Sequence, residues 1–441
     1  MEQFPQSSPR GPRRAPDNQA PHERPHADRR TGESRRGPSP HRTPTNKGAY
    51  AAKTNTGATR SSATDQQATA RPKSRYIPAL DGLRTLAVVA VVLYHLNLTW
   101  AQGGLLGVTI FFVLSGFVIG YAYDDRWNRM SLKDFFKRRL IRLHPMVVMG
   151  SVIGALFFYF QAAAFPMIAD VAWWKVLLIC LLACTILPAP PAWDIRGWGE
   201  TSPLNGPAWS LLYEYIANIL YALVIRRFSK LLLGFFVAAA AVLTLDLTLN
   251  LNLFGLLSAD RSVAWTVIGG WSVTPEQIYI GFSRLLYPFF AGLLLSRLGA
   301  LIRVRGGFWW CSLLIAAALV MPHVGDPSTP WFNGVYQALV ILFVFPLIVS
   351  MGAGSRVTDA KSIAVCKFLG EISYPLYITH YPLVYMQMAW AAGNPDAPLS
   401  THIFVSVSVF IMSVGLAWAC LKLYDLPVRK WLTRPRLKGR A

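Results

Sequence analysis

Long apolar segments recur along the chain after residue 75 and constrain its fold more than any other feature of the sequence. Each is near the length that a helix needs to cross roughly 30 Å of hydrocarbon. Because backbone amides in lipid must be bonded within their own segment, the sequence predicts an all-α bundle of membrane helices. The eleven segments are 77–98, 105–123, 146–164, 172–189, 208–225, 231–250, 277–296, 308–322, 332–352, 367–389 and 401–423.

The basic residues are unevenly distributed, and their positions predict how the chain is oriented. The formal net charge is +21, and three stretches carry most of it: residues 1–75 with 15 Lys/Arg against 6 Asp/Glu, 124–145 with 7 against 3, and 427–441 with 6 against none. Basic stretches that flank apolar spans favour the cytoplasmic side. Topology explains these stretches better than nucleic-acid binding does, so no nucleic-acid partner is predicted.

Two cytoplasmic termini require an even number of crossings, so we expect a polytopic bundle of about ten transmembrane helices. Region 172–225 contains a loop rich in Pro, Gly and Trp, and there one segment is expected to lie in the interface, re-enter or join a neighbour. Residues 75–432 are expected to form the membrane domain of a protein of the cytoplasmic membrane, followed by a basic tail over 433–441. Residues 1–74 have few aromatic residues and are predicted to be a disordered cytoplasmic tail, either a solvated spacer or a contact for anionic lipids.

An arginine and a histidine, Arg84 and His95, lie in the first apolar segment, LRTLAVVAVVLYH. Eleven residues at ~100° each return a helix to within about 20° of its starting direction, so both side chains share one face, about 16 Å apart along the axis. Asp81, three residues before Arg84, is expected to pair with it. A charge in a span is costly unless it faces the bundle interior or a wet cavity. The pair is therefore a candidate site, with a snorkelling arginine and a packed core histidine as the alternatives.

Further polar residues lie within other apolar segments and are candidates for function. Glu214 lies in NGPAWSLLYEYIANILY, and Arg284 in YIGFSRLLYPFF is a candidate partner for its carboxylate. Tyr374 and His380 lie in FLGEISYPLYITHYPL. Ser115 interrupts GGLLGVTIFFVLSGFVIG, where a hydroxyl either bonds back to its own helix or acts as a nucleophile. No metal site is predicted, because the five cysteines have no ligand spacing with histidine.

Three arginines follow one another closely in SLKDFFKRRLIRLHP, at positions 138, 139 and 142. One interpretation is a basic loop that only sets the topology of the chain. The other is a phosphate clamp, since arginines three or four residues apart on a helix can converge on an anionic headgroup or a nucleotide phosphate.

Together these motifs resemble those of the acyltransferase 3 family, the integral-membrane O-acyltransferases of bacterial surface glycans and some antibiotics. The resemblance covers roughly residues 75–432 and rests on six motifs in the family's order: ALDGLRTLAVVAVVLYH, GVTIFFVLSGFVI, FFKRRLIRLHP, AWSLLYE, ISYPLYITH and YDLPVRKWL. It implies transfer of an acyl group, usually acetyl, from cytoplasmic acyl-CoA to a hydroxyl near or beyond the outer face. Arg84 and His95 would be the central pair, and Arg139 and Arg142 would help to hold the donor.

The sequence departs from the family's pattern in two places. Many relatives have a second acid beside the glutamate of the WSL motif, whereas LLYEYIANILY keeps Glu214 alone. Many relatives also carry a soluble esterase-like domain after the spans, while this sequence ends at Ala441. The membrane domain is therefore expected to complete the reaction itself or to use a separate partner.

Acyl transfer from a thioester to an alcohol needs a base that takes the hydroxyl proton, and a neutral histidine suits this near pH 7. We expect His95 to be that base, Arg84 to position the donor or stabilise charge at the thioester, and Glu214 to take part in catalysis. Acyl-CoA is expected as a co-substrate, with no cofactor that stays bound, and the partners are membrane lipids and a carbohydrate or glycolipid acceptor. The remaining expected site residues are Arg138, Arg139 and Arg142 for binding acyl-CoA, and Asp81, Ser115, Tyr374, His380 and Arg284 for support.

Two other classes of function also use apolar spans. A transporter or flippase for a polar lipid-linked sugar would need charges within the membrane and a cavity, but no arginine–histidine pair on one face. A scaffold would use the spans only as anchors, for which one span is enough and buried Glu, Arg and His are unnecessary. Acyl transfer is the interpretation that uses all of these residues.

Overall fold

A computed structural model of the protein describes residues 77–96, 99–258, 261, 263–326 and 328–434. Regular structure within these ranges is entirely helical, which confirms the predicted all-α fold. The predicted tail of residues 1–74 and most of the predicted tail of residues 433–441 lie outside the described residues. The α-helices are α1 (Pro78–His95), α2 (Gly107–Tyr123), α3 (Leu132–Leu156), α4 (Trp173–Ala183), α5 (Ala208–Leu223), α6 (Lys230–Thr248), α7 (Pro275–Leu298), α8 (Gly307–Val320), α9 (Trp331–Leu339), α10 (Phe345–Gly354), α11 (Ala360–Thr379), α12 (Tyr381–Gly393), α13 (Leu399–Cys420) and α14 (Leu426–Thr433).

Seven helical segments in the described part of the chain are long and apolar enough to cross a membrane. They are Pro78–His95, Gln102–Arg126, Leu132–Leu156, Lys230–Thr248, Pro275–Leu298, Trp331–Gly354 and Leu399–Thr433, and the shorter apolar helices α4 and α8 accompany them. The last segment joins α13 to α14 through a π-helix, Leu421–Asp425, and exposes large apolar side chains such as Phe404 and Leu423. An apolar surface of this kind suits hydrocarbon rather than water, so the protein is a multi-pass membrane protein, as predicted.

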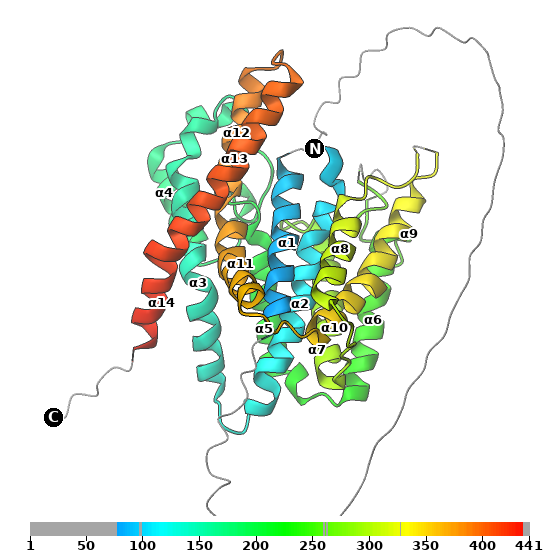
Figure 1. The fold of residues 1–441 in the computed structure, drawn as a ribbon. Helices are drawn as coiled ribbons and strands as arrows, with labels where there is room; N and C mark the ends of the chain where they lie inside the picture. Colours follow the sequence, from blue (N-terminus) through cyan, green and yellow to red (C-terminus); the bar gives the residue numbers. More distant parts are fainter. Residues whose placement is uncertain (1–76, 97–98, 259–260, 262, 327, 435–441) are drawn as a thin grey trace, which may run out of the picture. The chain divides into compact units, whose positions relative to one another are not determined.

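Helices α1 and α2 lie in the middle of the helical bundle, with α3, α13 and α14 on one side and α8 and α9 on the other (Figure 1). α2 packs closely against α7 because both helices have a glycine at their contact. A Cβ atom on Gly116 would overlap the carbonyl oxygen of Phe289, and one on Gly292 would overlap that of Val113. Small residues of this kind let helix backbones approach closely within a membrane.

Helix α3 begins at a capping box, which fixes where its basic residues start. The hydroxyl of Ser131 accepts a hydrogen bond from the amide of Asp134, and the Asp134 carboxylate accepts one from the amide of Ser131. These reciprocal bonds satisfy two amides that the first turn of a helix leaves without partners. The helix then continues through Pro145 as far as Leu156, so the arginines after the cap lie on its first turns.

The structure divides the predicted span 367–389 into two helices, α11 and α12, which meet at His380. Pro382 explains the break, because it has no amide hydrogen to donate to the carbonyl of Ile378 four residues earlier. The side-chain amide of Asn205 donates to that carbonyl instead, at 2.8 Å. His380 therefore stands at a junction that the surrounding structure holds in place, and its side chain is fully buried.

Candidate functional site

A small cavity of about 80 Å³ lies where α1, α2, α3, α5 and α11 meet. We call it the arginine cavity. Six residues selected from the sequence line it: Arg84, Ser115, Arg139, Arg142, Glu214 and Tyr374. The other polar residues of its lining are Ser210, Ser373 and Tyr377, and five apolar side chains complete it. Five helices thus bring together polar side chains from distant parts of the sequence.

The charged groups of the arginine cavity do not balance. Arg139 donates to the carboxylate of Glu214 at 2.7 Å, and both side chains are largely buried. Arg84 lies 3.6 Å from the carboxylate of Asp81, which confirms the predicted pairing. Arg142 has no carboxylate within ion-pair distance among the described residues. The cavity therefore has one guanidinium more than its paired acids neutralise, which favours an anionic ligand.

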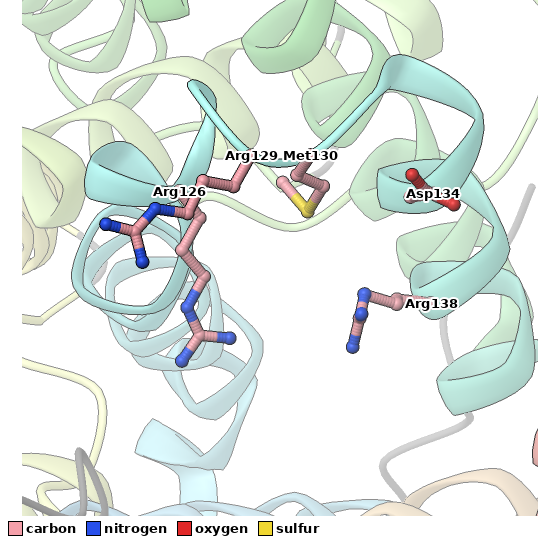
Figure 2. A pocket seen from close by; sticks show the side chains of 5 residues that line it. All are labelled: Arg126, Arg129, Met130, Asp134 and Arg138. Atoms are coloured by element: carbon pink, nitrogen blue, oxygen red, sulfur yellow. The ribbon is translucent and has the colours of Figure 1, made fainter. Parts of the chain in front are cut away.

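The basic cluster of α3 divides between two sites. Arg139 and Arg142 are three residues apart and lie on the same face of the helix, toward the arginine cavity. Arg138 instead lines a second pocket of about 270 Å³, the basic pocket, with Arg126, Arg129, Met130 and Asp134. Figure 2 shows the side chains of Arg126 and Arg129 on one side of this pocket and that of Arg138 on the other.

His95 is not part of the lining of the arginine cavity. Its Nδ1 atom lies 3.0 Å from Nε2 of His380, so these two histidines form a hydrogen-bonded pair. The rings of Tyr381 and Tyr94 pack against His95 with centroid distances of 4.7 and 5.5 Å. We call His95 and His380 the histidine pair.

Tyr377 connects the arginine cavity to the histidine pair. It lines the cavity, and its ring centroid is 6.1 Å from that of His380. Its hydroxyl lies 2.6 Å from the hydroxyl of Ser210, which also lines the cavity. The neighbouring Tyr374 is held by a hydrogen bond from its hydroxyl to the carbonyl of Leu143, at 2.6 Å. The cavity and the histidine pair are therefore adjacent parts of one polar region.

The candidate pairing of Arg284 with Glu214 is wrong. Arg284 donates to the carbonyl of Gly269 at 2.6 Å and to that of Leu105 at 3.3 Å. Its guanidinium also lies 4.7 Å from the ring centroid of Trp209. Backbone carbonyls and an aromatic face thus take the place of a carboxylate, and Arg284 ties α7 to the segments around it.

Sequence analysis did not select Ser373 and Tyr377, although both line the arginine cavity. A usable signal exists in their spacing, because Ser373, Tyr377 and His380 follow one another at four and three residues. Residues with this spacing lie on one face of a helix. The polar stripe that they form within an otherwise apolar segment marks the face of α11 toward the site.

Comparison with known proteins identifies relatives of the chain. Residues 77–422 match the family model described as an acyltransferase domain. The chain is 28% identical over 345 residues to "Peptidoglycan O-acetyltransferase OatA" of Listeria monocytogenes serovar 1/2a, which covers 72% of this chain and 50% of that protein. It is 26% identical over 379 residues to "O-acetyltransferase OatA" of Staphylococcus aureus strain NCTC 8325, which covers 81% of this chain and 58% of that protein.

A putative O-acetyltransferase of Staphylococcus aureus strain COL is 25% identical over 395 residues, with the same two coverages of 81% and 58%. The chain therefore spans about half the length of the curated relatives that it matches. No solved structure matches it. Because the family model covers most of the chain, including every residue of the arginine cavity and the histidine pair, the chain belongs to the acyltransferase 3 family.

Proposed function

We propose that the chain is a membrane O-acyltransferase that moves an acyl group, in the first instance acetyl, from acyl-CoA to a hydroxyl of a cell-surface carbohydrate or glycolipid. The family and the names of the relatives support acyl transfer to oxygen. One relative is named for peptidoglycan, which supports a glycan as the acceptor.

The observation that carries the proposal is the excess positive charge of the arginine cavity. Arg142 has no carboxylate within ion-pair distance among the described residues, and it shares the cavity with Arg84 and Arg139. Acyl-CoA carries several phosphate charges, and guanidinium groups bind phosphate oxygens through two parallel hydrogen bonds. An uncompensated arginine in a polar cavity is the arrangement that such a donor requires.

The two pockets suggest how a long donor is held. The arginine cavity, at about 80 Å³, has room for one small group rather than for a whole coenzyme. The basic pocket offers Arg126, Arg129 and Arg138 for further phosphate contacts. The donor has a flexible arm between its phosphates and its thioester, so it can be held by arginines and still present the thioester near His95, about 16 Å along α1 from Arg84.

The reaction needs a base that takes the proton of the acceptor hydroxyl. The acceptor hydroxyl attacks the thioester carbonyl carbon while His95 takes the hydroxyl proton, and a carbon–oxygen bond forms. The carbon–sulfur bond then breaks, and the thiolate that leaves takes the proton back from His95. Arg84 lies too far along α1 to reach a thioester beside His95, so its part is to position the donor by binding phosphate oxygens. The basic stretches at 124–145 and 427–441 favour the cytoplasmic side of the membrane for the helix ends that carry them. Acyl-CoA reaches the protein from that side.

The direct test uses the full-length chain in lipid nanodiscs with radiolabelled acetyl-CoA and soluble peptidoglycan fragments. We expect label to appear on the fragments, and replacement of Arg142 by glutamine to reduce the rate of labelling. Arg305→Gln, which removes an exposed arginine away from both pockets, is the matched control. If the chain moved an unmodified glycan across the bilayer of vesicles and transferred no label, it would be a transporter and the proposal would be wrong.

A further inference from the structure

The second histidine of the pair has a defined set of partners on both ring nitrogens. Nδ1 of His380 lies 2.8 Å from the carbonyl oxygen of Tyr377 and 3.1 Å from that of Leu376. Nε2 lies 3.0 Å from Nδ1 of His95. These distances allow the positions of the protons on both rings to be assigned from the chemistry of the partners.

Nδ1 of His380 carries a proton. Carbonyl oxygens can only accept hydrogen bonds, so a nitrogen in contact with two of them must donate. An unprotonated nitrogen there would place its lone pair against the lone pairs of the carbonyls of Tyr377 and Leu376. The ring is also fully buried and lies among neutral groups, and an isolated charge in such a place is costly. His380 is therefore the neutral tautomer with its proton on Nδ1, and its Nε2 can only accept.

The hydrogen on the bond between the rings must then come from His95. The ring planes are inclined by 18°, and the centroids are 5.2 Å apart while the bonded nitrogens are 3.0 Å apart. The nitrogens thus lie between two nearly parallel rings that meet edge to edge, where a hydrogen on one points at the in-plane lone pair of the other. With its Nδ1 donating, neutral His95 has its free lone pair on Nε2.

We propose that His380 is a positioning residue that accepts a hydrogen bond from Nδ1 of His95 and so holds His95 in the tautomer whose Nε2 takes the acceptor's proton. The inference deepens the proposed function and rests on it, because it names the reacting atom of the base and the group that orients it. A catalytic base oriented by a third group is a general requirement of such sites. Here the third group is a neutral imidazole in place of a carboxylate.

The surroundings of His380 make it suitable for this task. It stands at the junction of α11 and α12, where the carbonyl of Ile378 is bonded by Asn205 rather than by Pro382. The ring of Tyr381 packs against His95 and almost perpendicular to it. Residues locked by packing and backbone hydrogen bonds hold a reacting group in the narrow range of positions that catalysis requires. When His95 receives the proton from the acceptor, its bond to His380 becomes charge-assisted and stronger.

The tautomer is measured directly by nitrogen NMR on the wild-type chain in nanodiscs, with histidine labelled with ¹⁵N on both ring nitrogens. The spectra of His95→Gln and His380→Gln assign the two signals among the eight histidines of the chain. We expect a protonated Nδ1 and an unprotonated Nε2 for both residues. A His95 signal with its proton on Nε2, or one that exchanges freely between both tautomers, would overturn the inference. This measurement needs no turnover, so it remains informative even where no acyl transfer is detected.

Kinetics distinguish a positioning role from a merely structural one. His380→Leu removes the acceptor, and we expect it to lower kcat by roughly 10- to 100-fold while the KM for acetyl-CoA changes by less than about twofold. His380→Gln places an amide oxygen near the position of Nε2 and should restore kcat to within about tenfold of the wild type. His402→Leu, at a partly buried histidine that packs against Trp390 near the start of α13, is the matched control and should leave kcat unchanged.

Two results would contradict the role of His380 as a hydrogen-bond acceptor. One is wild-type kcat in His380→Leu. The other is an equal loss of kcat in His380→Leu and His380→Gln when both variants unfold at the wild-type temperature. If His380→Leu does not fold, the wild-type NMR spectrum and the activity of His380→Gln decide the question. Absence of any transfer by the wild type contradicts the proposed function instead, and leaves the tautomer assignment to the spectrum.

Discussion

Arg139 on α3 and Glu214 on α5 form an ion pair of 2.7 Å across the arginine cavity, with side chains that are only 13% and 15% exposed. The pair joins two helices that are 75 residues apart in the sequence at this point. It also takes the negative charge of Glu214 away from Arg84 and Arg142, which line the same cavity. Glu214, which sequence analysis assigned to catalysis, is therefore paired with Arg139 in the structure.

A double-mutant cycle measures the strength of this pair. Removing one partner leaves the other charge buried without compensation, so Arg139→Gln and Glu214→Gln should each lower the stability of the bundle. The double variant should be less destabilised than the two single effects predict, with a coupling free energy of about 1–3 kcal/mol. Reversible unfolding in mixed micelles gives the three values. Glu214→Gln combined with the exposed Arg303→Gln is the control, for which additive effects are expected. If the effects of Arg139→Gln and Glu214→Gln were also additive, the ion pair between these residues would contribute nothing to stability.

Arg142 is expected to contribute to donor affinity rather than to stability. One hydrogen bond to a charged group contributes roughly 1.5–3 kcal/mol, so Arg142→Gln should weaken acetyl-CoA binding by about 10- to 100-fold. Arg142→Lys keeps the charge but loses the two parallel hydrogen bonds of a guanidinium. Its affinity for acetyl-CoA should therefore lie between those of the wild type and Arg142→Gln. Calorimetric titration of the purified chain with CoA measures the affinity. An unchanged dissociation constant in Arg142→Gln would show that Arg142 does not bind the donor, and would leave the basic cluster of α3 with a role in topology alone.

His95 is expected to act on the chemical step. His95→Ala should reduce kcat by about 10²- to 10⁴-fold, the usual contribution of a general base, with little change in the KM for acetyl-CoA. The rate of label transfer to the glycan acceptor gives both parameters. His323→Ala, at an exposed histidine of the loop after α8, is the control. Full activity in His95→Ala would rule out the proposed base.

Local features of the sequence were enough to find six of the nine polar residues that line the arginine cavity. The three-residue spacing of Arg139 and Arg142 places both on one face of α3, and both line the cavity. The cost of a charge in a membrane singled out Arg84 and Glu214, which line it as well. Spacing along a helix is a property of one segment, so these predictions needed no knowledge of how the helices pack.

Contacts between helices could not be predicted in the same way. Periodicity shows which face of a helix is polar, but not which other helix that face meets. Arg284 was therefore assigned to Glu214, whereas backbone carbonyls take its hydrogen bonds and Arg139 takes the carboxylate. The bond between His95 and His380 joins residues 285 positions apart, and it exists because α11 packs beside α1 and stops at the histidine.

The close contact of α2 with α7 should tolerate no side chain at Gly116. A Cβ atom there would overlap the carbonyl oxygen of Phe289, and neither backbone can move without shifting a whole helix. Gly116→Ala is therefore expected to destabilise the bundle by roughly 1–3 kcal/mol, the usual cost of overpacking. The matched control is Gly234→Ala in α6, where a Cβ atom meets nothing within 4 Å. That variant should be neutral or stabilising by up to about 1 kcal/mol, because alanine favours a helix more than glycine does. Equal unfolding temperatures for the two variants would contradict this account of the contact.

A second buried acid–base cluster joins the loop between α4 and α5 to α12, and its two charged residues lie in that loop, outside the spanning helices. Arg196 Nε and Glu200 Oε2 are 3.9 Å apart, and the hydroxyl of Tyr385 donates to the Glu200 carboxylate at 2.9 Å. The guanidinium of Arg196 lies 3.6 Å from the ring centroid of Tyr385. Burial raises the pKa of Glu200 from its ordinary 4.5 to about 7, although Arg196 and Tyr385 act in the opposite direction.

This raised pKa predicts a dependence of stability on pH. Between the two pKa values the folded chain holds the Glu200 proton while the unfolded chain has released it. The contribution of Glu200 to stability is therefore fully present below about pH 4.5 and is lost as the pH rises through about 7. A neutral glutamine has no proton to lose, so the unfolding temperature of the wild type should fall relative to that of Glu200→Gln over this range. Thermal unfolding in the same detergent at a series of pH values measures the difference. Parallel profiles for Glu200→Gln and the wild type would show that Glu200 is not titrating in the folded chain as its burial requires.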